Sequence, residues 1–239
     1  MLKVDGCLLA IFAHPDDETF RCGGTLALLA QRGIEVQVLT ATRGEAGSCG
    51  DPPLCRPEQL PAVREKELRC ACDALGIAPP RLLDYPDGRL GEAQPELLTA
   101  QVHEVVTRLQ PDVILTFGLD GLSGHPDHIA IGHAAAEAFR QAEDTAALYT
   151  LALPRSVAER FGMRHLQPVS DEEITLTVDI TPVWGAKLAA MRCHATQIGA
   201  TPMMQAPSET QRAFFGTEYF ICAAVRHADR DIMRRGLNA

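Results

Sequence analysis

The sequence predicts an α/β protein with a mostly parallel sheet that is flanked by helices on both faces. Two observations lead to this fold class. Residues 7–13 (CLLAIFA) and 112–118 (DVILTFG) are dominated by apolar residues, which is typical of central parallel strands that are covered on both sides. Strand-like and helix-like segments also alternate along the chain, and right-handed β-α-β crossovers place such strands in one sheet. The expected arrangement is Rossmann-like.

The elements predicted in the first two thirds of the chain are bounded by glycine and proline. Residues 44–60 are rich in both and are expected to form a loop, after which Pro61 suits the first turn of a helix. Gly76 suits the end of that helix, because glycine readily adopts the left-handed conformation needed there. The predicted strands are 7–13, 35–42, 81–85, 112–118 and 147–152, and the predicted helices are 23–33, 61–75, 96–109 and 126–142.

The last third of the chain is less regular. A strand near 174–179, a helix near 182–193 and a strand near 217–225 are expected there. The 239 residues suit one domain with an ample core, and neither a repeat nor a low-complexity tract divides them. We therefore predict a single domain over 1–239, with a Rossmann-like core at about 5–152 and a C-terminal part at about 153–239.

The composition argues against several function classes. The formal net charge is −9, and the chain has no basic run from which a nucleic-acid-binding face could be built. No segment approaches the ~20 apolar residues that a membrane helix needs. The N-terminal apolar stretch runs into charged residues without a cleavage site, so we interpret it as a strand and not as a signal peptide. The expected location is the cytoplasm.

Cysteine usage fits the same location. Eight cysteines are present, and several lie in apolar runs, where a reduced cysteine behaves as a small hydrophobe. Without a secretory signal we expect reduced thiols, with Cys70 and Cys72 packed within a helix. A disulfide between Cys49 and Cys55 in the Gly/Pro-rich loop is the alternative.

Two polar loops are expected to meet at one edge of the sheet. In the strand order 3-2-1-4-5 the first and fourth strands are neighbours where the order reverses, and ligands bind outside the carboxyl ends of the strands at that point. The loop after the first strand reads AHPDDE (13–18), and the loop after the fourth reads GLDGLSGHPDH (118–128). These segments are far apart in sequence and are predicted to be close in space.

Together the two loops predict a catalytic metal site. Three consecutive acids at 16–18 repel one another, and a divalent cation would let them stay ionised side by side. Two histidines and one carboxylate with an open position form a familiar catalytic zinc set. Either motif alone could simply begin a helix, where acids complement the helix dipole, but both on neighbouring strands favour the metal site. The candidate residues are His14, Asp16, Asp17, His125, Asp127 and His128.

Chemistry suggests roles for these candidates. His14, His128 and one aspartate would bind the metal, and the other aspartate would take a proton from metal-bound water, whose pKa zinc lowers to about 7. His125 would stabilise the oxyanion or protonate a leaving amine, and Asp127 would orient a histidine. Residue types alone leave open which of the adjacent aspartates, Asp16 or Asp17, binds the metal.

AHPDDE together with GHPDH resembles the LmbE/PIG-L superfamily of metal-dependent N-deacetylases. The similarity runs from about residue 5 to 135, and CGGTL (22–26), TRGE (42–45) and VREKEL (63–68) also match family segments. The resemblance implies that His14, Asp17 and His128 bind zinc and that Asp16 is the base. It makes His125 the acid or oxyanion partner, tuned by Asp127.

The same resemblance implies residues that contact the substrate. Arg64 corresponds to a substrate-contacting arginine, with a plain surface arginine as the alternative, and Asp87 stands where some members hold a sugar hydroxyl. Arg43 and Glu45 follow the second strand at its carboxyl end, so they are predicted either to recognise substrate or to form an internal ion pair. Ser123 departs from the tyrosine that some sugar deacetylases carry.

One further candidate lies in the last third of the chain. His194 is part of KLAAMRCHATQ (187–197), which is a weaker echo of the family. It is expected either to line the site or to pack as an ordinary buried histidine.

The sequence thus predicts a zinc-dependent hydrolase that removes an N-acetyl group from an N-acetylglucosamine-type small molecule, with Asp16 activating the metal-bound water. Another divalent ion, such as Fe²⁺, is the alternative metal. The alternative functions are an amidase acting on a larger amide such as a thiol conjugate, and a non-catalytic sugar- or nucleotide-binding module. The expected partner is the small amino-sugar substrate, not nucleic acid or a membrane, and a homo-oligomer is a further option.

Overall fold

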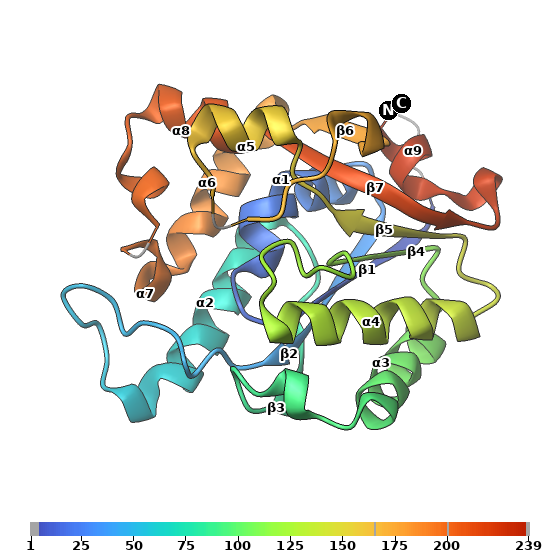
Figure 1. Cartoon of the computed structure of the whole chain (residues 1–239), viewed down its shortest axis with the longest axis horizontal. Coiled ribbons are helices and arrows are strands. Elements are labelled where there is room, and N and C mark those ends of the chain that lie inside the picture. The colour runs from blue at the N-terminus through green and yellow to red at the C-terminus, as the bar shows by residue number, and fades with distance from the viewer. Residues whose placement is uncertain (1–4, 165, 200, 238–239) are drawn as a thin grey trace.

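The computed structural model describes residues 5–164, 166–199 and 201–237. Its strands are β1 Cys7–Phe12, β2 Glu35–Thr42, β3 Arg81–Tyr85, β4 Val113–Thr116, β5 Ala147–Leu151, β6 Leu176–Asp179 and β7 Thr217–Val225. Within the described residues they form one seven-stranded sheet in the order β3-β2-β1-β4-β5-β7-β6. The first five strands of this order pair in parallel, and β7 and β6 are added antiparallel at one edge. The predicted order 3-2-1-4-5 is confirmed, so β1 and β4 are neighbours (Figure 1).

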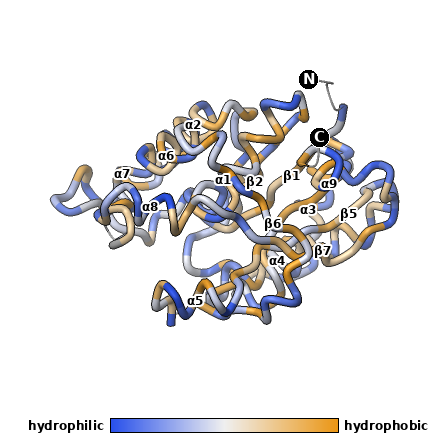
Figure 2. The backbone as a smooth tube through the Cα atoms, turned by 90° about the horizontal axis from the view of Figure 1, so that it is seen from above, coloured by the Kyte–Doolittle hydropathy of each residue, from blue (hydrophilic) through white to orange (hydrophobic). Residues whose placement is uncertain are grey.

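Helices cover both faces of this sheet, as predicted. They are α1 Asp17–Gln31, α2 Leu60–Leu75, α3 Pro95–Leu109, α4 Pro126–Gln141, α5 Arg155–Phe161, α6 Trp184–Cys193, α7 Ala195–Ile198, α8 Ser208–Phe215 and α9 Ile232–Leu237. Helices α1, α2 and α6 pack together, and α3 packs against α4. Seen from above, α2 and α6 lie on one side of the strands and α4 lies on the other (Figure 2). Among the described residues, no helix is long and apolar enough to cross a membrane.

The central strands are fully buried, in keeping with their continuous apolar runs. Leu8, Leu9, Ile11 and Phe12 of β1 are inaccessible to solvent, and so is all of β4. Burying each large aliphatic or aromatic side chain contributes about 1.5–3 kcal/mol to the free energy of folding. This rigid centre holds the carboxyl ends of β1 and β4 in fixed positions, from which the two polar loops start.

The C-terminal part is integrated with the core. Its β7 extends the sheet, and its α6 packs on α1 and α2. The helices α5, α8 and α9 were not predicted, because they are short and lack a long apolar period. Helix α1 begins at Asp17, whereas the sequence placed its start at residue 23, because the acids at 16–18 were assigned to the loop.

The prediction that all cysteines are reduced is wrong for one pair. Cys70 and Cys193 form a disulfide with their Cα atoms 5.7 Å apart, which joins α2 to the end of α6. The two residues are 123 positions apart, so only the packing of α2 against α6 brings them together. Cys72 is a buried free thiol inside α2, as predicted, and Cys49 and Cys55 are free as well.

Candidate metal centre and active site

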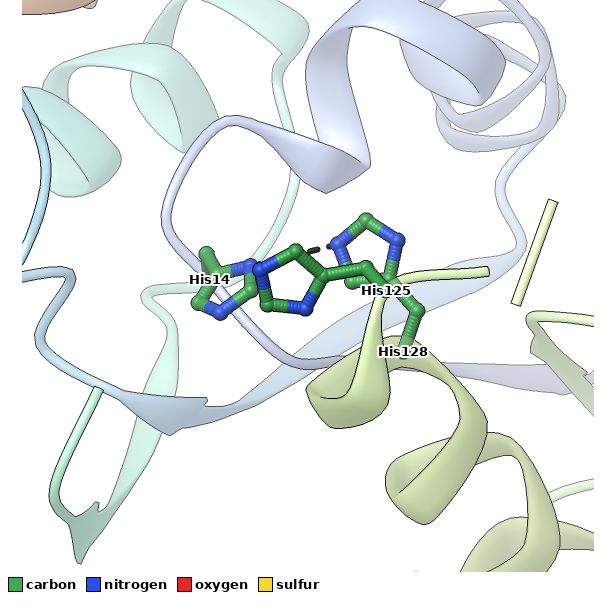
Figure 3. A group of neighbouring side chains, drawn as sticks. All are labelled: His14, His125 and His128. Atoms are coloured by element: carbon green, nitrogen blue, oxygen red, sulfur yellow. Dashed lines mark hydrogen bonds between the residues drawn. The ribbon is translucent and has the colours of Figure 1, made fainter. Parts of the chain in front are cut away.

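The two polar loops meet where the sequence placed them. His14 lies in the loop after β1, and His125 and His128 lie at the start of α4, with their rings facing His14 (Figure 3). Nε2 of His128 is 3.2 Å from Nδ1 of His14. Phe117, which follows β4, stacks on the His128 ring with a centroid distance of 4.0 Å and holds it in place. The convergence of the loops is therefore a property of the fold.

Asp17 completes a compact set of donor atoms. Its Oδ2 lies 3.7 Å from Nδ1 of His14, and its Oδ1 lies 3.4 Å from Nε2 of His128. Ligands about 2.1 Å from a tetrahedral ion are separated by about 3.4 Å. Each pairwise spacing is near this value, although a different oxygen of Asp17 approaches each histidine. The residues present fit a divalent metal.

Hydrogen-bond partners indicate which nitrogen of each histidine is free to bind a metal. Nδ1 of His128 lies 3.1 Å from the carbonyl oxygen of Gly121, which only accepts, so Nδ1 carries the proton and Nε2 is free. Burial lowers the pKa of His14, but the hydrogen bonds of its Nε2 with Asp127 and Asp87 outweigh burial and raise the pKa to about 10. Nε2 therefore keeps its proton, and Nδ1 is the nitrogen that would give up a proton to a metal. Nδ1 of His14 and Nε2 of His128 are the pair that lies 3.2 Å apart.

His125 has a different hydrogen-bonding state. Its Nδ1 accepts a 3.1 Å hydrogen bond from the backbone N–H of Asp127, which caps α4. The neutral ring therefore carries its proton on Nε2 and has no free lone pair. Burial, and then the charges of His14 and His128, lower the pKa of His125, which favours this neutral form. Although donor atoms of His14, His125 and His128 lie within 4.8 Å of one another, His125 is arranged as a donor and not as a ligand.

Asp127 and Asp87 lie behind His14. Nε2 of His14 is 3.2 Å from Oδ2 of Asp127 and 3.0 Å from Oδ1 of Asp87. Burial raises the pKa of Asp87, but the hydrogen bond and charge of His14 outweigh it and bring the pKa to about 2. Two ionised carboxylates that share one N–H increase the basicity of the opposite ring nitrogen and so strengthen a metal ligand.

That Asp127 tunes His125 stays a prediction: its charge opposes the burial that lowers the pKa of His125, but its carboxylate contacts a different histidine. The Asp127 carboxylate is fully buried and points at His14, while its oxygens also accept the backbone N–H groups of Gly88 at 2.8 Å and Leu90 at 2.9 Å. The hydrogen bond between Asp127 and His125 comes from the main-chain N–H of Asp127. The position of Asp127 in the first turn of α4 directs its side chain back toward the sheet, which the sequence motif alone could not indicate.

Asp16 lies beside the donor set in an unusual conformation. Its φ of 105° is in the left-handed region, where a residue with a Cβ is strained by about 1–3 kcal/mol. Its side chain is 23% exposed, and one oxygen accepts a 3.1 Å hydrogen bond from Nη2 of Arg64. Burial raises the pKa of Asp16 to about 7, and Arg64 opposes this rise. A carboxylate with a pKa near neutrality suits a general base.

Arg64 is buried, which excludes the surface-arginine alternative. It is 4% exposed and donates to the carbonyl oxygens of Pro15 at 2.5 Å and Gly44 at 2.7 Å, as well as to Asp16. Gly44 has a φ of 69°, and a Cβ there would collide with the guanidinium group, so glycine is required. Its described contacts are internal, and the predicted substrate contact of Arg64 stays a prediction.

The remaining predicted substrate residues brace the loops around the site. Arg43 pairs with Glu65 and, at 3.1 Å, with Asp84, which is the internal ion pair that the sequence offered as the alternative. Glu45 is exposed, and its Oε1 accepts a 3.0 Å hydrogen bond from the backbone N–H of Asp87. Substrate recognition by Arg43 and Glu45 stays a prediction.

Sequence reasoning missed the buried pair behind Asp16. His194 is fully buried, and its Nε2 lies 2.9 Å from Oε1 of Glu18, so this histidine packs below the site and does not line it. Glu18 entered the sequence argument only as the third of three acids. Its position in the first turn of α1, directly after the two catalytic candidates, was the available signal.

The structure defines a class of protein. It is an α/β protein with a candidate divalent-metal centre at the C-terminal ends of β1 and β4, and the carboxylate beside this centre is the candidate general base. A family model described as GlcNAc-PI de-N-acetylase (PIG-L) matches residues 9–139, which is more than half of the chain. The chain belongs to this family.

Individual relatives agree with this assignment. The chain is 34% identical over 251 residues to a 1D-myo-inositol 2-acetamido-2-deoxy-alpha-D-glucopyranoside deacetylase of Nocardia farcinica, with 84% of each chain covered. It is 32% identical over 199 residues to a probable N-acetyl-alpha-D-glucosaminyl L-malate deacetylase 2 of Bacillus anthracis, covering 82% of this chain and 83% of the relative. Among solved structures, a conserved protein of Thermus thermophilus matches with a TM-score of 0.69 and 26% identity, over 95% of this chain and 96% of that one.

Proposed function

We propose that the chain is a metal-dependent hydrolase that removes the N-acetyl group from an N-acetylglucosamine-type small molecule. The observation that carries this proposal is geometric: the side chains of His14, Asp17 and His128 converge, and the Asp16 carboxylate, held by Arg64, lies beside them. The relatives support the choice of reaction, since they are named as deacetylases of an acetamido-deoxy-glucopyranoside and of an N-acetylglucosaminyl malate.

The proposed ligands are Nδ1 of His14, Nε2 of His128 and the carboxylate of Asp17. Their spacings support this set, and so do the hydrogen-bond partners that occupy the opposite nitrogen of each imidazole. A bound divalent ion supplies a Lewis acid and lowers the pKa of a bound water to about 7. Zinc is the proposed ion, and Fe²⁺ is the alternative.

We assign the proton transfer and the oxyanion stabilisation to two side chains beside the metal ligands, Asp16 and His125. Asp16 takes the proton of the attacking water, and the pKa of about 7 lets it release that proton again to the leaving amine. His125 donates its Nε2–H to the amide carbonyl oxygen as negative charge develops there, because its Nδ1 is occupied by the N–H of Asp127. The C–N bond breaks, and the products are acetate and a free amino sugar.

We propose that residues at the solvent-facing edge of the site recognise the sugar. Arg64 and Asp87 are buried and turned toward internal partners, so we propose that they shape the site from behind. Arg43 and Glu45 lie nearer the surface and are also proposed to contact substrate, and the predicted substrate contacts of Arg64 and Asp87 stay predictions.

An acetate-release assay tests the reaction. The zinc-loaded protein is incubated with N-acetylglucosaminides that carry inositol, malate or other aglycones, and with a larger amide such as a thiol conjugate. We expect acetate from at least one N-acetylglucosaminide. We also expect Asp16→Asn to retain its metal and to lose about 10²–10⁴-fold in kcat, as for a missing general base.

Three results would contradict the proposal or select an alternative. Cleavage confined to the larger amide selects the amidase, and sugar binding without hydrolysis selects the binding module. Full activity of Asp16→Asn would refute the assignment of the base.

We propose that the protein is located in the cytoplasm, and the redox state of its cysteines tests this proposal. The disulfide between Cys70 and Cys193 opposes it, because the cytosol keeps thiols reduced. Mass spectrometry after thiol alkylation in intact cells measures the redox state of this pair. Light scattering of the purified protein tests whether it forms a homo-oligomer, which the sequence left open.

A further inference from the structure

A buried acid–histidine pair lies directly beneath the proposed base. Glu18 and His194 are both fully buried, and Nε2 of His194 is 2.9 Å from Oε1 of Glu18. The hydroxyl of Thr19 donates to the same oxygen at 2.5 Å and lies 3.3 Å from Nε2 of His194. Glu18 and His194 are 176 positions apart, so the pair connects the C-terminal part of the chain to the loop after β1.

The second oxygen of Glu18 reaches the proposed base itself. Oε2 accepts a 2.9 Å hydrogen bond from the backbone N–H of Asp16. Asp16 has the strained φ of 105°, and such conformations persist only where the surroundings impose them. Glu18 therefore restrains the main chain of Asp16, while Arg64 restrains its carboxylate.

Two contacts with α2 anchor the segment that carries His194, one before this residue in the sequence and one after it. Cys193, one residue earlier, is bonded to Cys70 of α2. Thr196, two residues later, donates its N–H at 2.8 Å and its hydroxyl at 2.7 Å to Glu67 of the same helix. His194 is thus held at a fixed place, from which it satisfies a carboxylate that would be costly to bury without a partner.

We propose that Glu18 and His194 are positioning residues for Asp16, holding its main chain so that its carboxylate stays directed at the reacting water. This inference rests on the proposed function. It assigns the C-terminal part of the chain a role in catalysis without any contact with substrate.

The chain offers a matched control. Glu218 is also buried, accepts the backbone N–H groups of Gly24 and Thr25 in α1 at 2.9 and 2.7 Å, and pairs at 2.7 Å with the buried Lys187 of α6. Both pairs join α1 to the α6 region, but only the Glu18 pair touches Asp16. Glu218→Gln therefore measures how much stability and activity are lost when a buried pair is damaged but the contacts of Asp16 are left in place.

The kinetic test compares side chains that do and do not reach Glu18. His194→Gln places an amide nitrogen where Nε2 of His194 lies, and His194→Asn is one methylene shorter. We expect His194→Asn to lower kcat about 10–100-fold, the range for partners that orient an active-site group, with KM and zinc content unchanged. His194→Gln should recover most of the loss. Glu218→Gln should lower the melting temperature while kcat stays within about twofold of the unmodified protein.

A second variant guards against misfolding. Thr19→Val removes one hydrogen bond to Glu18 with little change of shape, and we expect a smaller fall in kcat in the same direction. Wild-type kcat in both His194→Asn and Thr19→Val would overturn the proposal, and so would an equal fall in Glu218→Gln.

A readout independent of turnover separates this inference from the proposed function. Hydrogen–deuterium exchange of the metal-free proteins is followed in the peptide that contains Asp16. We expect faster exchange there in His194→Asn and unchanged exchange in His194→Gln and Glu218→Gln. If the unmodified protein releases no acetate from any substrate, the proposed reaction fails, but faster exchange would still support the restraint on Asp16. Unchanged exchange in His194→Asn would overturn the restraint whatever the activity.

Discussion

The two loops that build the site differ in how their shapes are determined. In the loop after β4, near neighbours place the two imidazoles: Nδ1 of His125 caps α4 through an N–H two residues on, and Nδ1 of His128 bonds to the carbonyl of Gly121, seven residues back. The loop after β1 is shaped from a distance. The carboxylate of Asp16 is held by Arg64, which is 48 positions away, and its main chain by Glu18, which in turn pairs with a histidine 176 positions away.

Each loop keeps one non-glycine residue in the left-handed region, Asp16 at φ 105° after β1 and Leu122 at φ 64° after β4, but only Asp16 carries a proposed catalytic group. The locally determined loop places imidazoles in ordinary helix-start geometry, and its function depends mainly on the residues themselves. The remotely supported loop keeps a residue at φ 105°, so its function also depends on residues that never meet the substrate. Substitutions in the two loops, and in the residues that support them, should therefore change different measured properties and by different amounts.

The largest effect is expected from His128→Ala, with His125→Ala as its partner within the same loop. His128→Ala removes a proposed ligand, so zinc content and activity should both fall to background. His125→Ala removes only an oxyanion donor and should keep zinc while kcat falls about 10²–10³-fold. Metal analysis of the dialysed proteins together with acetate release checks both. Loss of zinc from His125→Ala and not from His128→Ala would reverse the assigned roles.

Asp127→Asn tests the bridge between the loops, since Asp127 lies on α4 and its carboxylate faces His14. We expect zinc affinity to fall about 10–100-fold, as for other outer partners of a ligand. Competition with a chromogenic chelator measures this change. An unchanged affinity would show that Asp87 alone is enough to orient His14.

Arg64→Lys probes the remote support of the carboxylate. The charge is kept but the forked contacts to Pro15, Gly44 and Asp16 cannot all be made, so we expect kcat to fall about 10-fold. Arg64→Met also removes the charge that holds down the pKa of Asp16, so that pKa rises and the acid limb of kcat/KM moves to higher pH. The pH profile of the three proteins is the measurement. A shift to lower pH in Arg64→Met would contradict the assignment of that limb to Asp16.

The smallest effect on turnover is expected from removing the disulfide with Cys70→Ser and Cys193→Ser. His194 and Thr196 keep their own hydrogen bonds, so kcat should stay within about twofold. Stability should fall by about 2–4 kcal/mol, the usual effect of opening a native disulfide. Urea unfolding and acetate release check the two expectations separately. A large loss of kcat at unchanged stability would show that the covalent link itself positions His194.

Much of the fold and the site's composition could be predicted from sequence because the signals are local. The runs 7–13 and 112–118 became β1 and β4, and the strand order followed from the β-α-β alternation. The expected convergence of His14, Asp17 and His128 also followed, since parallel strands end at one edge of a sheet. The short helices of the last third gave no such signal, because they have too few turns for an apolar period.

What the sequence by itself determined is which chemical groups reach the edge of the sheet, since residue type, strand alternation and motif spacing act over a few positions. Only the tertiary structure decided which group supports which. Asp127 faces His14 and not His125, Arg64 turns inward to Asp16, and His194 reaches Glu18 across the chain. These pairings depend on how α2, α4 and α6 pack against the rest of the molecule, and packing is the sum of many distant contacts that no short segment encodes.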